Sequence, residues 1–295
     1  MCICSLKNSI QKHDYNSFYY LTIFPGVSKQ MSLRRSILLT SSLSNSRTVL
    51  TSRTGFLLPR QARRGIMEDY RKWKAMGEGG TSHSIIGYLS QLSVDKTRAY
   101  GANETIKPGF YNKPEKRATG WKKATEEQKV NAKKSFFREP LPVRPGPRAR
   151  ALPFVYPQRE RNAADPQPPD VKQAYLDAFK KLGETNAEST EWNISAMEKH
   201  GQALFIKPSL PLTPIAGPSA REICHIHGTD LSGHVTLSFP DAEEVISKGW
   251  GERHRLSGTG WIHLGFTMLY VPNTIEEVDT FIKIYQAGID YMKSG

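Results

Sequence analysis

The 295-residue chain has few cysteines and no long hydrophobic run, and each absence excludes a class of protein. Its three cysteines are Cys2, Cys4 and Cys224, so the body of the chain holds a single thiol and no disulfide framework, which fits a reducing compartment. No window approaches the roughly 18 apolar residues of a membrane span, so the sequence predicts no transmembrane segment. Because 38% of the residues are hydrophobic, a packed core of one or two domains still fits the composition.

Acidic residues are nearly missing from the N-terminal part of the chain. The net charge is +13, and residues 1–66 account for +9 of it because they contain ten Lys or Arg and one acid, Asp14. The remaining +4 is dispersed, so the charge does not predict a nucleic-acid partner. The basic tract from Lys107 to Arg150 is interpreted as a solvated linker.

The stretch that begins at Met31 has the composition of a mitochondrial transit peptide. It is rich in Arg, Ser, Thr and Leu and contains no acid up to the Arg63-Arg64 pair. We therefore predict a disordered leader over residues 1–66, removed near this pair, and a mitochondrial location. A disordered basic tail on a cytoplasmic protein is the alternative. The sequence leaves open whether translation starts at Met1 or at Met31.

The remainder of the chain divides by composition into two parts. Residues 67–168 are predicted to form short helices and a Pro- and Arg-rich extended segment that wraps around the body. The arginines of this segment are expected to be solvated, with one of them able to pair with an acid of the core; they are Arg144, Arg148, Arg150 and Arg159. Residues 169–295 are predicted to be the folded core, beginning with an amphipathic helix.

Four of the eight histidines fall between Arg221 and Gly258. His225 and His227 alternate with apolar residues at the period of a strand, a cluster of Gly, Thr, Asp and Ser follows, and a second alternating run begins at His234. This pattern predicts a β-hairpin whose front carries the three imidazoles of His225, His227 and His234. Cys224 would then lie on the apolar back, as a core residue.

The elements around this hairpin define the fold class. A strand is expected from Met197 to Ile206, with Glu198 and His200 on one face. After the hairpin, the sequence predicts a helix that opens at Pro240, a strand from His263 to Val271, and a last helix capped by Thr274 and Glu277, whereas His263 itself is expected to be exposed. The prediction is an α+β domain with a mainly antiparallel sheet, a His-bearing hairpin and flanking helices.

The candidate catalytic residues are His225, His227, His234, Glu198, His200, Arg253 and His254. Three interpretations are open for them. His225, His227 and His234 could bind one divalent metal ion, with Glu198 or His200 completing its ligands. The imidazoles could instead act as metal-free acids and bases beside Arg253 and His254, with no cofactor required. In the third interpretation they form a hydrogen-bonded network without chemistry.

Several segments in this region resemble the fungal luciferase family, most of whose members are not luminous. The matching segments are MEKHGQALF, REICHIH, GHVTLS, KGWGERHRLSG and FTMLYVPNTIEEV. The positions on the family pattern are Glu198, His200, Glu222, His225, His227, His234, Gly249, Trp250, Gly251, Arg253, His254, Tyr270 and Pro272, with a fainter match at Pro157-Gln158-Arg159. The departures are Arg255 for proline, Ser257 for alanine, and Asn273 for an arginine that could hold an enolate or carboxylate.

The resemblance implies an oxidoreductase of the oxygenase type. Its reaction would be the oxygen-dependent oxidation of an enolisable hydroxypyrone or phenolic small molecule, without an obligatory organic cofactor. Small-molecule substrate and molecular oxygen are then its expected partners. The alternative function is that of a non-enzymatic mitochondrial binding or assembly protein that retains the fold. The sequence specifies neither the oligomeric state nor whether light is emitted.

Overall fold

The computed structural model describes residues 60–295, with side chains from Arg64 onward. The predicted leader, with its disorder and its transit peptide, therefore falls almost wholly outside the described residues. Its location, its start and the domain boundaries at residues 66 and 168 stay predictions. No helix in the described part is long and apolar enough to cross a membrane.

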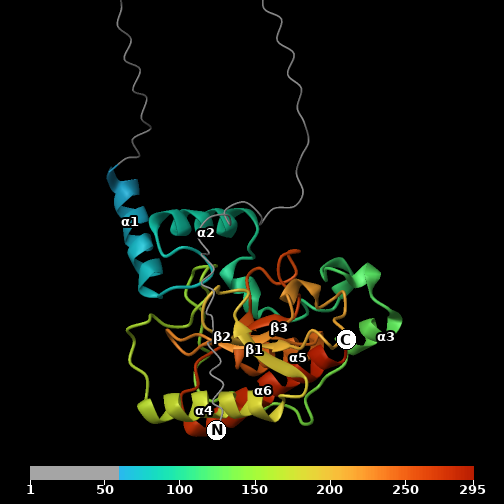
Figure 1. Cartoon of the computed structure of the whole chain (residues 1–295). Helices are drawn as coiled ribbons and strands as arrows, with labels where there is room; N and C mark the ends of the chain where they lie inside the picture. The colour runs from blue at the N-terminus through green and yellow to red at the C-terminus, as the bar shows by residue number, and fades with distance from the viewer. Residues whose placement is uncertain (1–59) are drawn as a thin grey trace, which may run out of the picture. The chain divides into compact units, whose positions relative to one another are not determined.

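The core is a six-stranded antiparallel sheet with the strand order β1-β2-β3-β4-β6-β5 (Figure 1). Every pair of neighbouring strands is antiparallel, which confirms the predicted α+β class. The strands are β1 (Thr190–Ile194), β2 (Gln202–Ile206), β3 (Glu222–Ile226), β4 (Gly233–Thr236), β5 (Gly251–Arg253) and β6 (Phe266–Leu269).

Helices lie on both sides of this sheet. The longest, α4 (Pro169–Thr185) and α6 (Ile275–Lys293), run side by side beneath it, whereas α1 (Arg60–Ala75) and α2 (Ile85–Thr97) lie on the other side (Figure 1). The remaining helices are α3 (Glu126–Ala132), α5 (Phe239–Lys248) and the short 3-10 turns η1 (Ala102–Ile106), η2 (Pro114–Lys116), η3 (Trp121–Lys123) and η4 (Gly217–Ser219).

The predicted hairpin is formed by β3 and β4. His225 pairs with His234 and Cys224 pairs with Val235, so successive residues point alternately to the two sides of the sheet. Cys224 and Val235 pack in the main hydrophobic core with residues of α6, which confirms the apolar back. The imidazoles lie on the opposite side, the one nearer α1 and α2.

Local sequence fixes the ends of the helices around the hairpin. The Ser238 hydroxyl accepts from the Asp241 amide at the start of α5, and Gly249 ends that helix with φ of 87°, a conformation that glycine adopts without strain. Thr274 caps α6 in the same way by accepting from the Glu277 amide at 3.3 Å. The Glu277 carboxylate does not close the predicted capping box, because it binds Asn273 and Arg144 instead.

Two strand predictions were wrong in extent. The strand expected from Met197 begins only at Gln202, because a turn intervenes in which Lys199 has a φ of 64°. Glu198 and His200 therefore do not share a strand face. The strand expected from His263 to Val271 is confined to β6, and His263 is buried, not exposed, with its Nε2 3.0 Å from the Tyr291 hydroxyl.

The Pro- and Arg-rich segment lies against the core along much of its length. Arg144 and Arg159 are buried, so the expectation of solvated side chains was wrong for both. Arg144 donates to the Glu277 carboxylate at 2.8 and 3.1 Å and to the Val271 carbonyl at 2.6 Å. Because these partners are distant in sequence, the ion pair ties the segment to the start of α6.

Replacing Arg144 with alanine is expected to destabilise the protein strongly. The change leaves the Glu277 carboxylate buried without its cation, and loss of one partner of a buried ion pair costs about 3–5 kcal/mol. Denaturant unfolding followed by circular dichroism measures the free energy of unfolding. Lys72→Ala, which breaks the exposed Lys72–Glu68 pair, is the control and should leave stability unchanged. Equal effects of the two changes would contradict this account.

Candidate functional site

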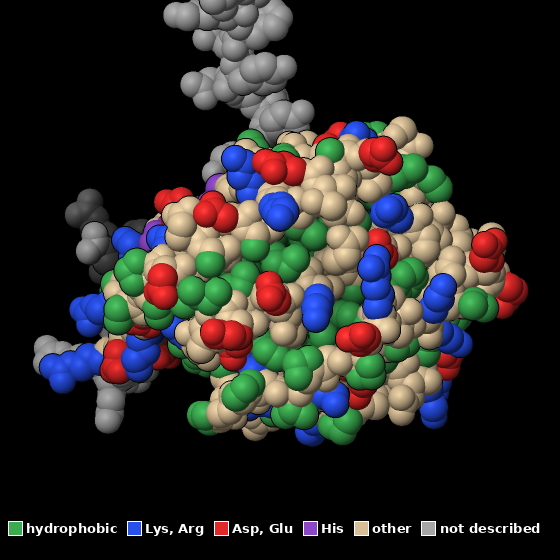
Figure 2. All heavy atoms as spheres, turned by 90° about the horizontal axis from the view of Figure 1, so that it is seen from below, with side chains coloured by type: hydrophobic (Ala, Val, Ile, Leu, Met, Phe, Trp, Pro, Cys, Tyr) green, Lys and Arg blue, Asp and Glu red, His purple; other side chains and the backbone are tan. Residues whose placement is uncertain are grey.

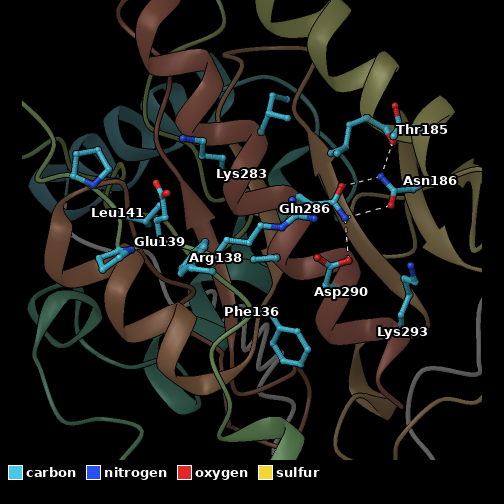
Figure 3. A pocket seen from close by; sticks show the side chains of 16 residues that line it. Phe136, Arg138, Glu139, Leu141, Thr185, Asn186, Lys283, Gln286, Asp290 and Lys293 are labelled. Atoms are coloured by element: carbon cyan, nitrogen blue, oxygen red, sulfur yellow. Dashed lines mark hydrogen bonds between the residues drawn. The ribbon is translucent and has the colours of Figure 1, made fainter.

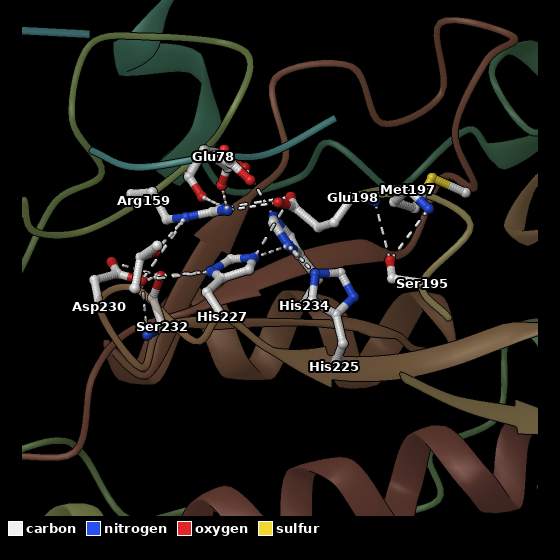
Figure 4. A network of polar contacts seen from close by, with 12 residues as sticks. Glu78, Arg159, Ser195, Met197, Glu198, His225, His227, Asp230, Ser232 and His234 are labelled. Atoms are coloured by element: carbon white, nitrogen blue, oxygen red, sulfur yellow. Dashed lines mark hydrogen bonds and ion pairs between the residues drawn. The ribbon is translucent and has the colours of Figure 1, made fainter. Parts of the chain in front are cut away.

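Three buried imidazoles face one another on the side of the hairpin away from α6 (Figure 4). His234 Nδ1 lies 2.9 Å from His227 Nε2 and 3.3 Å from His225 Nε2. His225 and His234 are a cross-strand pair, and His227 follows directly after β3. One ligand atom from each of these histidines and one from Glu198 lie within 4.8 Å of one another, so the group could hold a metal ion.

The outward-facing nitrogens of two of these rings have hydrogen-bond acceptors. His225 Nδ1 donates to the Glu222 carboxylate at 2.5 Å. His227 Nδ1 donates to the Ser232 hydroxyl at 2.9 Å, because that hydroxyl donates its own proton to the Asp230 carboxylate at 2.8 and 2.9 Å. These acceptors fix the protons on the outer nitrogens and leave both Nε2 atoms, in the neutral rings, with lone pairs directed inward.

A register shift in the sheet brings Glu222 to the histidine side. Phe205 of β2 pairs with Glu222, whereas the preceding residue, Leu204, pairs with Cys224, so β3 carries one extra residue, Ile223. Strict alternation would place Glu222 and His225 on opposite faces, and this bulge puts them on the same one. Glu222 also accepts from the Ala196 amide at 2.6 Å, which holds the turn that leads to Glu198.

A buried guanidinium, that of Arg159, lies beside the cluster. It donates to the Glu198 carboxylate at 2.5 and 3.2 Å and lies 4.0 Å from Asp230 (Figure 4). Glu198 Oε1 is 3.8 Å from His227 Nε2. The neighbouring Gln158 places its Oε1 3.4 Å from His234 Nε2. The ion pair of Arg159 and Glu198 thus lies at the edge of the cluster.

Burial favours the neutral form of two imidazoles of the cluster. It lowers the pKa of His227 and of His234 well below the usual value, with Arg159 adding to the effect at His227 and His227 itself at His234. At Glu222 burial acts to raise the pKa, but the hydrogen bonds from His225, Ala196 and Ser195 outweigh it and the pKa is lowered. The site therefore combines two imidazoles, His227 and His234, whose neutral form is favoured, with a carboxylate, that of Glu222, whose ionised form is favoured.

The structure does not bring all the candidate residues together. His225, His227, His234 and Glu198 form the cluster, and the His254 ring lies 5.3 Å from that of His234. His200 is exposed.

The predicted position of Arg253 beside the histidines was wrong. Arg253 pairs with Thr267, Thr267 with Val235, and Val235 with Cys224, which places Arg253 on the core side of the sheet. There its guanidinium donates to the carbonyls of Glu104 and Lys107. The guanidinium beside the histidines belongs to Arg159 instead.

Sequence reasoning missed Arg159 and Asp230 as members of the site. The only signal for Arg159 was the faint resemblance at Pro157-Gln158-Arg159, and Asp230 was read as a turn residue. A second arginine, Arg161, donates to the Asn273 side chain at 2.9 Å. The resemblance leads one to expect arginine at position 273. Asn273 stands there instead, and it contacts a guanidinium from another segment.

The histidine cluster lies inside a region that matches known proteins. Residues 220–288 match the family model described as the luciferase domain. The chain is 36% identical over 168 residues to a luciferase of Armillaria mellea and 32% identical over 163 residues to a luciferase of Neonothopanus nambi. Each alignment covers 52% of this chain and 61% of the relative, so the chain spans less than two thirds of these luciferases. No solved structure matches.

These findings connect the histidine cluster with a known protein domain. The three histidines of the cluster lie within the matched domain. The chain therefore contains a luciferase domain and resembles fungal luciferases over about half of its length.

A separate cavity of about 760 Å³ lies between α4, α6 and residues 136–142 (Figure 3). None of the candidate catalytic residues lines it. Its labelled lining residues are Phe136, Arg138, Glu139, Leu141, Thr185, Asn186, Lys283, Gln286, Asp290 and Lys293. The molecular face seen from this side carries basic and acidic side chains interspersed with apolar ones, without a field of one sign (Figure 2).

The buried His263 predicts a measurable loss of stability in acid. Burial lowers its pKa to about 3, and its Nδ1 accepts from the Gly265 amide, so the folded state holds it neutral. The unfolded chain binds the proton at a pKa near 6.5. Stability is therefore fully present above about pH 6.5 and is lost as the pH falls toward 3, by about 2 kcal/mol at pH 5 for this one group.

Denaturant unfolding of the wild type and of His263→Asn between pH 5 and 8 measures this contribution. The variant should lose about 2 kcal/mol less than the wild type between pH 8 and pH 5. Parallel pH profiles of the two proteins would contradict the assignment of a neutral His263.

Gly79 lies where the loop after α1 covers the cluster, and replacing it is predicted to destabilise the protein. A Cβ there would lie closer than 3.0 Å to atoms of Glu198, Pro157 and Arg159. Gly79→Ala should therefore destabilise the protein by about 1–3 kcal/mol through overpacking. Gly65→Ala in the exposed part of α1, where a Cβ meets nothing within 4 Å, is the matched control and should be stabilising. Thermal unfolding of both variants measures the difference.

Proposed function

We propose that this luciferase-domain protein catalyses the oxygen-dependent oxidation of an enolisable hydroxypyrone or phenolic small molecule at the histidine cluster. The observation that carries the proposal is the set of three buried imidazoles whose inner nitrogens converge while their outer nitrogens are held by other groups. The similarity to curated luciferases supports the oxidative class of the reaction. Because the chain covers only part of those relatives, the substrate and the activity belong to the proposal.

The cluster has the groups that the first step of such a reaction requires. An inward Nε2 lone pair of His225 or His227 can take the acidic proton of an enolisable hydroxyl, and Glu222 or the Ser232–Asp230 pair then stabilises the resulting imidazolium. The enolate supplies the electrons that reduce oxygen as a carbon–oxygen bond forms. Two forms of the site fit this scheme, one that acts without a cofactor and one that holds a single divalent metal ion.

Access to the cluster has to pass the residues that cover it. Gly80 donates its amide to the Glu198 carbonyl at 3.0 Å, and Arg159 donates to the Glu78 carbonyl at 3.0 Å. The loop after α1 is therefore hydrogen-bonded to both residues of the ion pair at the edge of the cluster. We propose that this loop moves with Arg159 and Glu198 when substrate enters.

Oxygen consumption by the purified full-length protein tests the proposed reaction. With a panel of hydroxypyrones and phenolics, the wild type should consume oxygen, and His225→Ala or His227→Ala should lower the rate by about 10²–10⁴-fold because a proton-transfer group is lost. His263→Asn, which removes a buried imidazole outside the cluster, is the control and should keep the wild-type rate at pH 8. Oxygen uptake that is equal in the wild type and the cluster variants would overturn the proposal.

A further inference from the structure

The hydrogen bonds around the cluster leave at least one inward-facing nitrogen without a full hydrogen bond. His225 and His227 each turn Nδ1 to an outer acceptor and direct Nε2, which carries a lone pair in the Nδ1–H tautomer, at His234 Nδ1. His234 can offer one proton to these two lone pairs, or none if its proton sits on Nε2 toward Gln158. In either tautomer at least one buried nitrogen lacks a full hydrogen bond, a costly arrangement unless another positive group occupies the centre.

The spacing of the three nitrogens matches ligands of one metal ion. Imidazole nitrogens bind such ions at about 2.0–2.1 Å, so two ligands lie about 3.0 Å apart at a right angle and about 3.4 Å apart at the tetrahedral angle. The two separations in the cluster, 2.9 and 3.3 Å, are close to these two values. Hydrogen bonding alone accounts for one short separation, but not for the convergence of three lone-pair-bearing nitrogens.

The charged groups around the cluster also favour a divalent cation. The carboxylates of Glu198, Glu222 and Asp230 contact the cluster or its immediate partners, and Arg159 is the cation among them. Three carboxylates therefore stand beside one guanidinium in a buried volume, a surplus of acidic groups that suits a divalent cation at the centre.

We propose that His225 Nε2, His227 Nε2 and His234 Nδ1 bind one divalent first-row transition metal ion, with Glu198 as the neighbouring carboxylate. Imidazole ligands favour zinc, iron, copper, nickel or cobalt over magnesium and calcium. Glu222 and the Ser232–Asp230 pair then occupy the place of the outer carboxylates and hydroxyls that orient metal-bound histidines. As the cofactor of the oxidation this ion rests on the proposed function, and it would supply a Lewis acid for an enolate oxygen.

Metal binding is measurable without any substrate. The full-length protein, freed of metal by a chelator, is titrated calorimetrically with Zn²⁺ and Co²⁺, with Mg²⁺ as the negative probe. The wild type should bind one equivalent of Zn²⁺ or Co²⁺ and none of Mg²⁺. Glu222→Ala should weaken binding by about 10–100-fold, His225→Ala and His227→Ala by more, and His263→Asn should bind as the wild type does. Absence of binding, or binding that survives both cluster variants, would overturn the inference.

A spectroscopic measurement on the wild type covers the case in which the cluster variants fail to fold. Bound Co²⁺ should give hyperfine-shifted, exchangeable imidazole N–H resonances from three histidines, because each outer nitrogen retains its proton. No shifted exchangeable resonance would overturn the inference without any variant.

Different experimental results would reject the metal site and the proposed function. Full oxygen consumption by the metal-free protein would reject the metal as cofactor and leave the oxidation standing. Stoichiometric metal binding without oxygen consumption on any substrate of the panel would leave the site standing and reject the proposed reaction.

Discussion

The hydrogen bond from His225 to Glu222 is the contact on which the arrangement of the site depends. Three imidazoles can be buried together with their inner nitrogens facing one another only if other groups take the outer protons. Glu222 does this for His225, and its second role, accepting from the Ala196 amide, fixes the turn that carries Glu198. One carboxylate thus sets both the orientation of a ring and the position of the acid beside it.

The second constraint is the ion pair of Arg159 with Glu198. Both side chains are buried, and such a pair is tolerated only where further hydrogen bonds satisfy its atoms. Arg159 also donates to the Glu78 carbonyl and to the Thr229 hydroxyl. The loop after α1, the Pro- and Arg-rich segment and the hairpin turn therefore converge on a single guanidinium. Segments that look like linkers in the sequence form the wall of the site.

The two sides of the sheet differ in polarity. The side against α6 is apolar and contains Cys224, whose pKa is raised by burial and which packs as a core residue. The other side holds buried polar groups, and the loop after α1 and the Pro- and Arg-rich segment lie against them. The large cavity between α4 and α6 lies away from the histidines, so cavity volume and candidate chemistry do not coincide in this molecule.

Much of the fold could be predicted from the sequence because its signals are local. Alternation at Cys224–His227 and again from His234 predicted the hairpin and its two faces, and Ser238, Gly249 and Thr274 mark helix ends through contacts within a few residues. The strand from Met197 was predicted too long because nothing local announces that Lys199 adopts a left-handed conformation.

The candidate site was predictable only in part, because its remaining contacts are distant in sequence. Alternation along the chain is enough to place three histidines on one face of a hairpin, because it depends only on strand geometry. Tertiary structure alone decided that Arg159, and not Arg253, stands beside them, since strand order and packing put Arg253 on the other face. It also decided the role of Glu222, because a single inserted residue reverses which way a side chain points and leaves no signal in the sequence.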